Sequence, residues 1–221
     1  MTDMKMNKFM NSLVETLIEK NGVTKGTAMK YVGDLYRLNG ERKFSNLVFL
    51  NDVEAIMKKV NAKSSVNTQA SYMSSIVGVL NTKKASLKYS KLHAEYKRLY
   101  LTIRKALTEQ SNTHKKTEKE KAYWMSWEDV IDKREELASE ITEDESHKTM
   151  LDHVVLSLYT YIPPRRNEYV YMWVVDSMED ATDNTRNYFV MNEDKFVFNQ
   201  YKTKRYLGQQ TVDIPDELSV I

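Results

Sequence analysis

The spacing of apolar residues constrains this chain more than any other feature. Through about residue 160 they recur at helical spacing. Beyond residue 186 the pattern changes to short β-branched and aromatic runs, "NYFVM", "KFVFNQ" and "QTVDI", with a turn-like "NED" between the first two. A helical period cannot line one face of a sheet, so the two regions must fold differently. The sequence predicts a mainly α fold with a small antiparallel sheet near its end.

The first 108 residues predict a bundle of four or five helices. A helix over about residues 6–20 is followed by three segments that begin at capping residues: Thr24 or Thr27, Asn51 or Asp52, and Ser65. The first and third share a pattern, Ser/Thr-x-x-Thr-x-x-x-Tyr-x-x-x-Leu/Ile, which is ordinary capping and core chemistry. Residues 83–108 predict a longer helix with one apolar face, formed by Leu92, Tyr96, Leu99, Ile103 and Leu107.

Charge is divided unevenly along the chain. Residues 1–123 contain 23 Lys/Arg against 11 Asp/Glu, a net charge of +12, whereas residues 124–221 contain 10 against 20, a net charge of −10. Such asymmetry is typical of a polyanion-binding module joined to another domain, although a solvated basic face without a partner is the alternative. Much of the basic charge lies beside the apolar face of the long helix: Lys84, Lys88, Lys91, Lys97, Arg98, Arg104 and Lys105.

A polar segment separates the two regions. Residues 109–122, "EQSNTHKKTEKEKA", have no apolar periodicity, which is typical of an exposed linker. We therefore predict a helical domain over residues 1–108 and an α+β domain over residues 123–221. In the second domain, Ser126 caps a helix, and "HKTMLDHVVLSLYTYI" is apolar almost all round and is expected at the centre of the core.

The sequence excludes or disfavours several kinds of functional site and several cellular locations. The absence of cysteine removes disulfides, thiolate zinc sites and cysteine nucleophiles, and fits a reducing intracellular compartment. There is no signal peptide core, no apolar run of membrane-spanning length and no glycine-rich phosphate loop. We expect a cytoplasmic or nuclear protein that uses no metal and no other cofactor.

One stretch carries the chemistry. "YIPPRRNEYVYMWVVD", residues 161–176, places two adjacent arginines and a glutamate between apolar flanks, and a lysine-containing hairpin, "NQYKTKRYLGQQTVDIP", follows. The apolar flanks favour arginines at the edge of a cleft over arginines on an open face. The plain alternative is a helix-capping turn with surface arginines.

This stretch and the hairpin resemble the catalytic domain of the tyrosine recombinase (phage integrase) family. The resemblance makes Arg165, in Arg165-x-x-Glu168, the counterpart of the first catalytic arginine, and Lys202 the hairpin lysine, with Lys204 as the alternative. The basic helices look like the family's helical core-binding domain, and "AYWMSWEDV" looks like the entry to its catalytic domain. The resemblance implies an enzyme that cleaves and rejoins duplex DNA, assembled on DNA as a tetramer.

The sequence departs from the family pattern after the hairpin. The family requires a His-x-x-Arg motif, a further His or Trp and a nucleophilic tyrosine, and none of these follows Lys202; Tyr206 is too close to it to be the nucleophile. We therefore interpret the chain as the front part of a longer recombinase and expect the 221 residues alone to be inactive in cleavage.

The resemblance assigns roles that fit the chemistry of each side chain. A guanidinium binds two phosphate oxygens at once, which suits Arg165 to the charge that develops on the scissile phosphate. A lysine on a hairpin can protonate the leaving oxygen, the role of Lys202. Glu168 is expected to orient Arg165, and Arg166 to contact phosphate or solvent. The competing hypotheses are a DNA-binding or regulatory protein with the same fold but no chemistry, and a helical protein-interaction module.

Overall fold

The chain forms two compact units, Met1–Thr117 and Glu118–Ile221. The computed structural model describes residues 5–143 and 146–221. The division lies inside the predicted linker, but much of that linker is helical. The long helix α5 continues to Asn112, and Glu118–Ala122 forms the short helix α6. Runs of lysine, glutamate and alanine favour helix even without an apolar stripe, so the lack of periodicity did not indicate a loop here.

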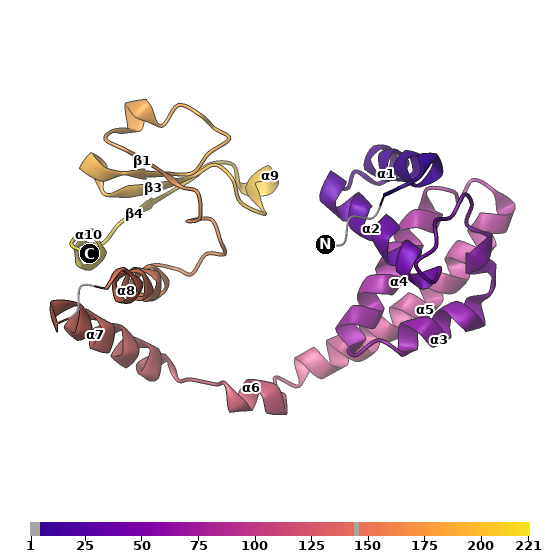
Figure 1. Cartoon of the computed structure of the whole chain (residues 1–221), viewed down its shortest axis with the longest axis horizontal. Coiled ribbons are helices and arrows are strands. Elements are labelled where there is room, and N and C mark those ends of the chain that lie inside the picture. Colours follow the sequence, from indigo (N-terminus) through magenta and orange to yellow (C-terminus); the bar gives the residue numbers. More distant parts are fainter. Residues whose placement is uncertain (1–4, 144–145) are drawn as a thin grey trace. The chain divides into compact units, whose positions relative to one another are not determined.

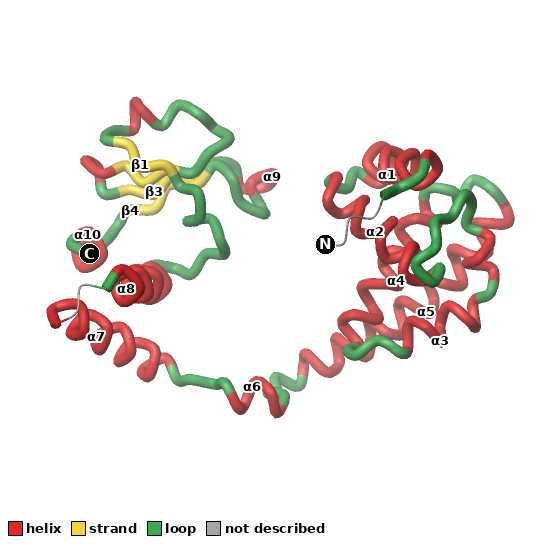
Figure 2. Tube along the Cα trace, viewed as in Figure 1, coloured by secondary structure: helices red, strands yellow, loops and turns green. Residues whose placement is uncertain are grey.

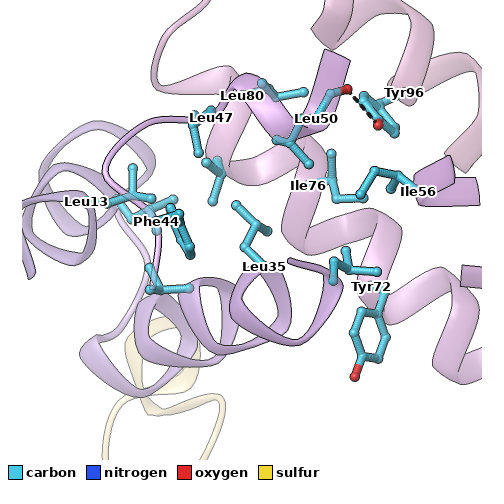
Figure 3. Packing of buried hydrophobic residues seen from close by; sticks show 14 of the residues in the cluster. Leu13, Leu35, Phe44, Leu47, Leu50, Ile56, Tyr72, Ile76, Leu80 and Tyr96 are labelled. Carbon is cyan, nitrogen blue, oxygen red and sulfur yellow. Dashed lines mark hydrogen bonds between the residues drawn. The ribbon is translucent and has the colours of Figure 1, made fainter. Parts of the chain in front are cut away.

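Unit 1 is a bundle of five α-helices with one 3-10 turn (Figure 1). Its elements are α1 (Lys8–Asn21), α2 (Lys25–Leu38), η1 (Val48–Asn51), α3 (Val53–Asn61), α4 (Val66–Asn81) and α5 (Leu87–Asn112). The predicted apolar faces enclose one core, in which Leu13, Leu35, Phe44, Ile76 and Leu80 converge (Figure 3). The buried hydroxyl of Tyr96 donates to the carbonyl of Leu50 at 2.9 Å, and so joins α5 to η1.

Polar side chains start the helices where the sequence indicated. Of the alternatives, Thr24 rather than Thr27 caps α2, and Asp52 rather than Asn51 caps α3, while Ser65 caps α4. Each accepts a hydrogen bond from a backbone N–H in the first turn, which satisfies a donor that the helix leaves unpaired. In α2 and α4 a threonine three residues later bonds the capping hydroxyl, the physical content of the repeated pattern.

Unit 2 combines helices with a four-stranded sheet (Figure 2). Its helical elements are α6, α7 (Trp127–Glu143), α8 (His147–Thr160), η2 (Met178–Asp180), η3 (Met191–Glu193), α9 (Lys204–Leu207) and α10 (Asp216–Ser219). Its strands are β1 (Trp173–Val175), β2 (Tyr188–Val190), β3 (Lys195–Phe198) and β4 (Gln210–Asp213). Across the two units the fold is therefore mainly α with a small sheet, as predicted.

The sheet is mixed rather than antiparallel. The three predicted strands are β2, β3 and β4, and they pair in antiparallel order. The fourth strand, β1, was not predicted; it pairs with β2 in parallel at the edge of the sheet. Its three residues follow an apolar run without a turn signal, so the sequence could not show whether their spacing was that of a strand or of a helix.

The prediction for α8 was wrong. The residue of this helix that is fully buried is Ser157, while Met150, Leu151 and Val155 are exposed. The C-terminal end of α8 does reach a core, where Leu158 packs with Ile162, Phe196 and Phe198. An apolar residue on every side of a helix indicates how much surface it can bury, but not how much the neighbouring elements cover.

Candidate phosphate-binding site

The turn after α8 is held in place by its neighbours. Pro163 and Pro164 restrict the backbone, and the hydroxyl of Tyr159 donates to the carbonyl of Arg166 at 2.6 Å. The amide of Asn187, at the start of β2, donates to the carbonyl of Glu168 at 2.9 Å. The turn that carries the two arginines is therefore attached both to α8 and to the sheet.

Arg165 lies flat against an aromatic ring at the end of β3. The guanidinium carbon is 3.8 Å from the centroid of the Phe198 ring, and that ring is fully buried. Stacking fixes the plane of a guanidinium while leaving its N–H donors at the edges available. No hydrogen bond or ion pair joins Arg165 to any residue that the structure describes. The guanidinium is therefore oriented by the ring, while its N–H donors have no partner among those residues.

A pocket of about 390 Å³ adjoins the arginine. It lies between the turn and the connection from β3 to β4 and is lined by Pro163, Pro164, Arg165, Arg166, Glu168, Tyr201, Thr203 and Gln210. The structure thus brings together the arginine motif and the hairpin, which are far apart in the sequence. The resulting hollow offers two guanidinium groups to a ligand.

Lys202 and Lys204 differ in how they are held. Lys202 is exposed between two residues that line the pocket, Tyr201 and Thr203, but does not itself line it. The ammonium group of Lys204 donates to the carbonyl of Asn184 at 2.9 Å. Lys202 is therefore free to swing toward a bound group, whereas Lys204 has a structural partner.

Glu168 lines the pocket but forms no hydrogen bond with Arg165. One of its carboxylate oxygens, Oε2, is buried and has no hydrogen-bond partner among the described residues. No ion pair is formed between the Glu168 carboxylate and the guanidinium in this part of the chain, so the ring of Phe198 holds the arginine. The orienting role of Glu168 stays a prediction.

The neighbouring tyrosine is a core residue. The ring of Tyr169 packs edge-on against Phe196 and Phe198, and burial raises the pKa of its hydroxyl to about 12, although Arg165 opposes part of the shift. A phenol that holds its proton so firmly is a poor nucleophile at neutral pH.

Two residues of this site could not be found from the sequence. Asn187 is buried and also joins the strands: its amide oxygen accepts from the N–H groups of Asn199 at 2.8 Å and Gln200 at 2.6 Å, and its amide nitrogen donates to the carbonyl of Gln200. Phe198 was predicted only as a strand residue. Both act through contacts between distant segments, for which the sequence carries no local signal.

The basic residues of unit 2 fall into two groups. Six form ion pairs with carboxylates: Lys121, Lys133, Arg134, Lys148, Arg186 and Lys195. The others form none with the carboxylates that the structure describes: Lys119, Arg165, Arg166, Lys202, Lys204 and Arg205. Five of these six lie in the arginine turn or in the β3–β4 connection. Of these five, Arg165 and Arg166 line the pocket, while Lys202, Lys204 and Arg205 belong to the connection whose Tyr201 and Thr203 line it.

Unit 1 presents a basic surface along α5. All seven predicted cations are exposed: Lys84, Lys88, Lys91, Lys97, Arg98, Arg104 and Lys105. Lys84 precedes the helix, which begins at Leu87 rather than at residue 83. Lys91, Arg98 and Lys105 are one heptad apart and so remain on one side of the helix, since successive heptads drift by only about 20°. Burial lowers the pKa of His93, and the positive charges of Lys97 and Lys84 lower it further.

The chain matches no protein-family model, no curated protein and no solved structure. Among residues 5–143 and 146–221, no three His, Asp or Glu side chains lie together in a way that could hold a metal ion. Over the same residues, each helix is too short or too polar to cross a membrane.

Proposed function

We propose that this chain is the DNA-binding front part of a tyrosine recombinase. In this proposal unit 1 is the core-binding domain and binds duplex DNA through the cations of α5, because lysine and arginine on a helix face neutralise phosphates. Unit 2 is the first part of the catalytic domain and holds one phosphodiester at Arg165. The protein works inside the cell, on DNA, as a tetramer.

The observation that carries the proposal is the way in which the guanidinium of Arg165 is held. Its guanidinium is stacked on Phe198 at 3.8 Å, at the edge of a pocket, and is not neutralised by a described carboxylate. A surface arginine in a capping turn would be free to move in solvent and would need no ring beneath it. An oriented fork without a protein partner suits a planar or tetrahedral oxyanion such as phosphate.

The hairpin lysine fits a second role. In the proposed reaction a tyrosine oxygen bonds to phosphorus and releases its proton to solvent, while the bond to the 5′ oxygen breaks and that oxygen takes up a proton. Lys202 supplies this proton because its ammonium group is free and lies between two residues of the pocket wall, whereas Lys204 is bonded to Asn184. The proposal assigns the attack to a tyrosine outside these 221 residues; of the tyrosines near Arg165, Tyr169 is buried, and the hydroxyl of Tyr201 donates to the carbonyl of Gly208.

The alternative is a DNA-binding or regulatory protein that keeps these units but does no chemistry. The gene separates the two functions. A coding sequence that continues past Ile221 into His-x-x-Arg and a tyrosine supports the enzyme, and a stop codon directly after Ile221 supports the non-catalytic protein.

Variants of the paired arginines test the phosphate site. Arg165→Ala should weaken duplex binding by about 10- to 100-fold, the value of losing a charge-assisted contact. Arg165→Lys should weaken it nearly as much, because one ammonium cannot replace a two-pronged contact. Arg166→Ala is the matched control and should cost only a few-fold. Fluorescence anisotropy of a labelled duplex measures all three.

Two results would contradict the proposal. The first is an equal loss of duplex affinity in Arg165→Ala and Arg166→Ala, which would indicate that only positive charge, and not the orientation of Arg165, matters for binding. The second is a covalent adduct between the 221-residue chain and DNA in a denaturing gel, because the proposal places the nucleophile elsewhere. Chemical denaturation of each variant is the control that separates a loss of binding from a loss of folding.

A further inference from the structure

The connection between β3 and β4 exposes two large apolar side chains at its tip. This tip is the short helix α9, which lies at the end of the sheet opposite α10 (Figure 1). Tyr206 is 79% exposed and Leu207 is 60% exposed. Single exposed apolar residues are common on proteins, so exposure alone would not indicate a function.

The tip is built as a rigid projection. The hydroxyl of Tyr201 donates to the carbonyl of Gly208 at 2.6 Å, and Gln209 donates to the side chain of Asn199 at 2.7 Å. Lys204 ties the same segment to the carbonyl of Asn184. Gly208 ends α9 with a φ of 70°, a conformation that favours glycine. These bonds close the base of the connection, so Tyr206 and Leu207 are held away from the core.

The surroundings of the tip are basic. Lys204 and Arg205 lie within it, and Lys202 lies two residues before it. No Asp or Glu occurs between Lys195 and Asp213. The guanidinium of Arg205 lies 5.8 Å from the centroid of the Tyr206 ring. Tyr201, Thr203 and Gln210, at the two ends of the connection, line the pocket that adjoins Arg165. An apolar tip among cations therefore stands beside a phosphate site.

Apolar side chains flanked by cations are the means by which proteins open the minor groove of DNA. The cations hold the two phosphate chains while an apolar wedge enters between base pairs and unstacks them. We propose that Tyr206 and Leu207 form such a wedge and unstack a base step of duplex DNA next to the phosphate held by Arg165. The inference rests on the proposed function, since it needs duplex DNA at this pocket.

The unstacking itself can be measured with 2-aminopurine, whose fluorescence rises when it leaves the base stack. The probe is a short duplex of alternating thymine and adenine, with 2-aminopurine in place of some adenines, because TA steps unstack easily. We expect binding of the 221-residue chain to raise the fluorescence several-fold. Tyr206→Ala combined with Leu207→Ala should abolish the rise, and Tyr206→Phe should keep it, because a wedge needs the ring and not the hydroxyl.

The edge of the sheet offers a matched control. Tyr171→Ala combined with Val174→Ala removes another tyrosine and another aliphatic residue, which are exposed to at least the same extent, and should leave the rise unchanged. Anisotropy of the same duplex reports binding separately.

Each remaining outcome counts against the inference. If the chain binds but the fluorescence does not rise, or rises equally in the Tyr206 and Leu207 double variant, the wedge is wrong while the proposed function stands. If the chain does not bind duplex DNA, both fail. Binding to phosphatidylserine vesicles that depends on Tyr206 and Leu207, without a rise on DNA, would assign the tip to a membrane surface instead.

Discussion

At the scale of single residues, Asp34 shows what unit 1 depends on. The residue is 3% exposed, and its carboxylate accepts hydrogen bonds from Lys30 at 2.6 Å, Arg37 at 3.0 Å and Ser75 at 2.7 Å. Lys30 also donates to Ser71, so the network joins α2 to α4. Removing the carboxylate loses three charge-assisted hydrogen bonds, one of them the link from α2 to the buried hydroxyl of Ser75 in α4.

Asp34→Ala should therefore lower the free energy of unfolding of unit 1 by about 3 kcal/mol. Glu109→Ala is the control, because its ion pair with Lys105 is exposed and 3.8 Å long, and it should cost less than about 0.5 kcal/mol. Urea denaturation of both variants gives the comparison. Equal costs would show that the Asp34 network contributes no more than a surface pair.

The hydroxyl of Tyr169 predicts a pH dependence. Burial raises its pKa to about 12, while an unfolded tyrosine titrates near 10, so between these pH values the folded chain keeps a proton that the unfolded chain loses. The stability that this group contributes is complete below pH 10 and is lost as pH rises toward 12, by up to about 2 to 3 kcal/mol.

Tyr169→Phe should remove this loss, and it should not destabilise the fold at neutral pH because the buried hydroxyl has no partner among the described residues. The measurement is the difference in free energy of unfolding between the wild-type chain and this variant, at pH 8 and pH 11. Lysines and the other tyrosines titrate in both chains and cancel. A difference that stays constant between the two pH values would contradict the burial of Tyr169.

At the scale of elements, the sequence predicted where helices begin and whether a segment is helix or strand better than it predicted which elements pack together. The N-caps Thr24 and Ser65 and the strands β2 to β4 were predicted because each has a local cause, a capping hydroxyl or a β-branched run. The parallel strand β1 and the exposed side of α8 were missed because both are decided by which distant element lies alongside. For the same reason the sequence could not indicate that the ring of Phe198 lies beneath Arg165.

Variants of Asn187 test how the elements are joined, since this one side chain connects the arginine turn to the end of β3. Asn187→Asp keeps the oxygen that accepts from Asn199 and Gln200 but loses the donor to the carbonyls of Glu168 and Gln200, while Asn187→Ala loses all of these bonds. We expect Asn187→Ala to lower the free energy of unfolding of unit 2 by about 2 to 3 kcal/mol and Asn187→Asp by less. Hydrogen exchange should speed up at the amides of Asn199 and Gln200 in the alanine variant only. Equal exchange in both would contradict this division of roles.

At the scale of the whole molecule, charge separates the tasks of the two units. Residues 1–123 carry a net charge of +12 and residues 124–221 a net charge of −10, so in the proposed function the first region would supply the long-range attraction to DNA. In the acidic region, two of the cations that form no ion pair with a described carboxylate, Arg165 and Arg166, line one pocket, and the proposed function places the phosphate contact there. The proposed function needs both features: a broad basic helix for affinity and a local fork for the scissile phosphate.

Duplex binding by the 221-residue chain as a function of salt tests this account most directly. The logarithm of the association constant should fall linearly with the logarithm of salt concentration, with a slope of about −0.9 per neutralised phosphate. Lys91→Ala, Arg98→Ala and Lys105→Ala together should weaken binding and make the slope shallower by about 2 to 3. Lys8→Ala, Arg42→Ala and Lys58→Ala together, which remove the same charge from other exposed sites of unit 1, should change the slope by less than half as much. Binding that does not depend on salt, an equal effect of the two triple variants, or no binding at all would contradict it.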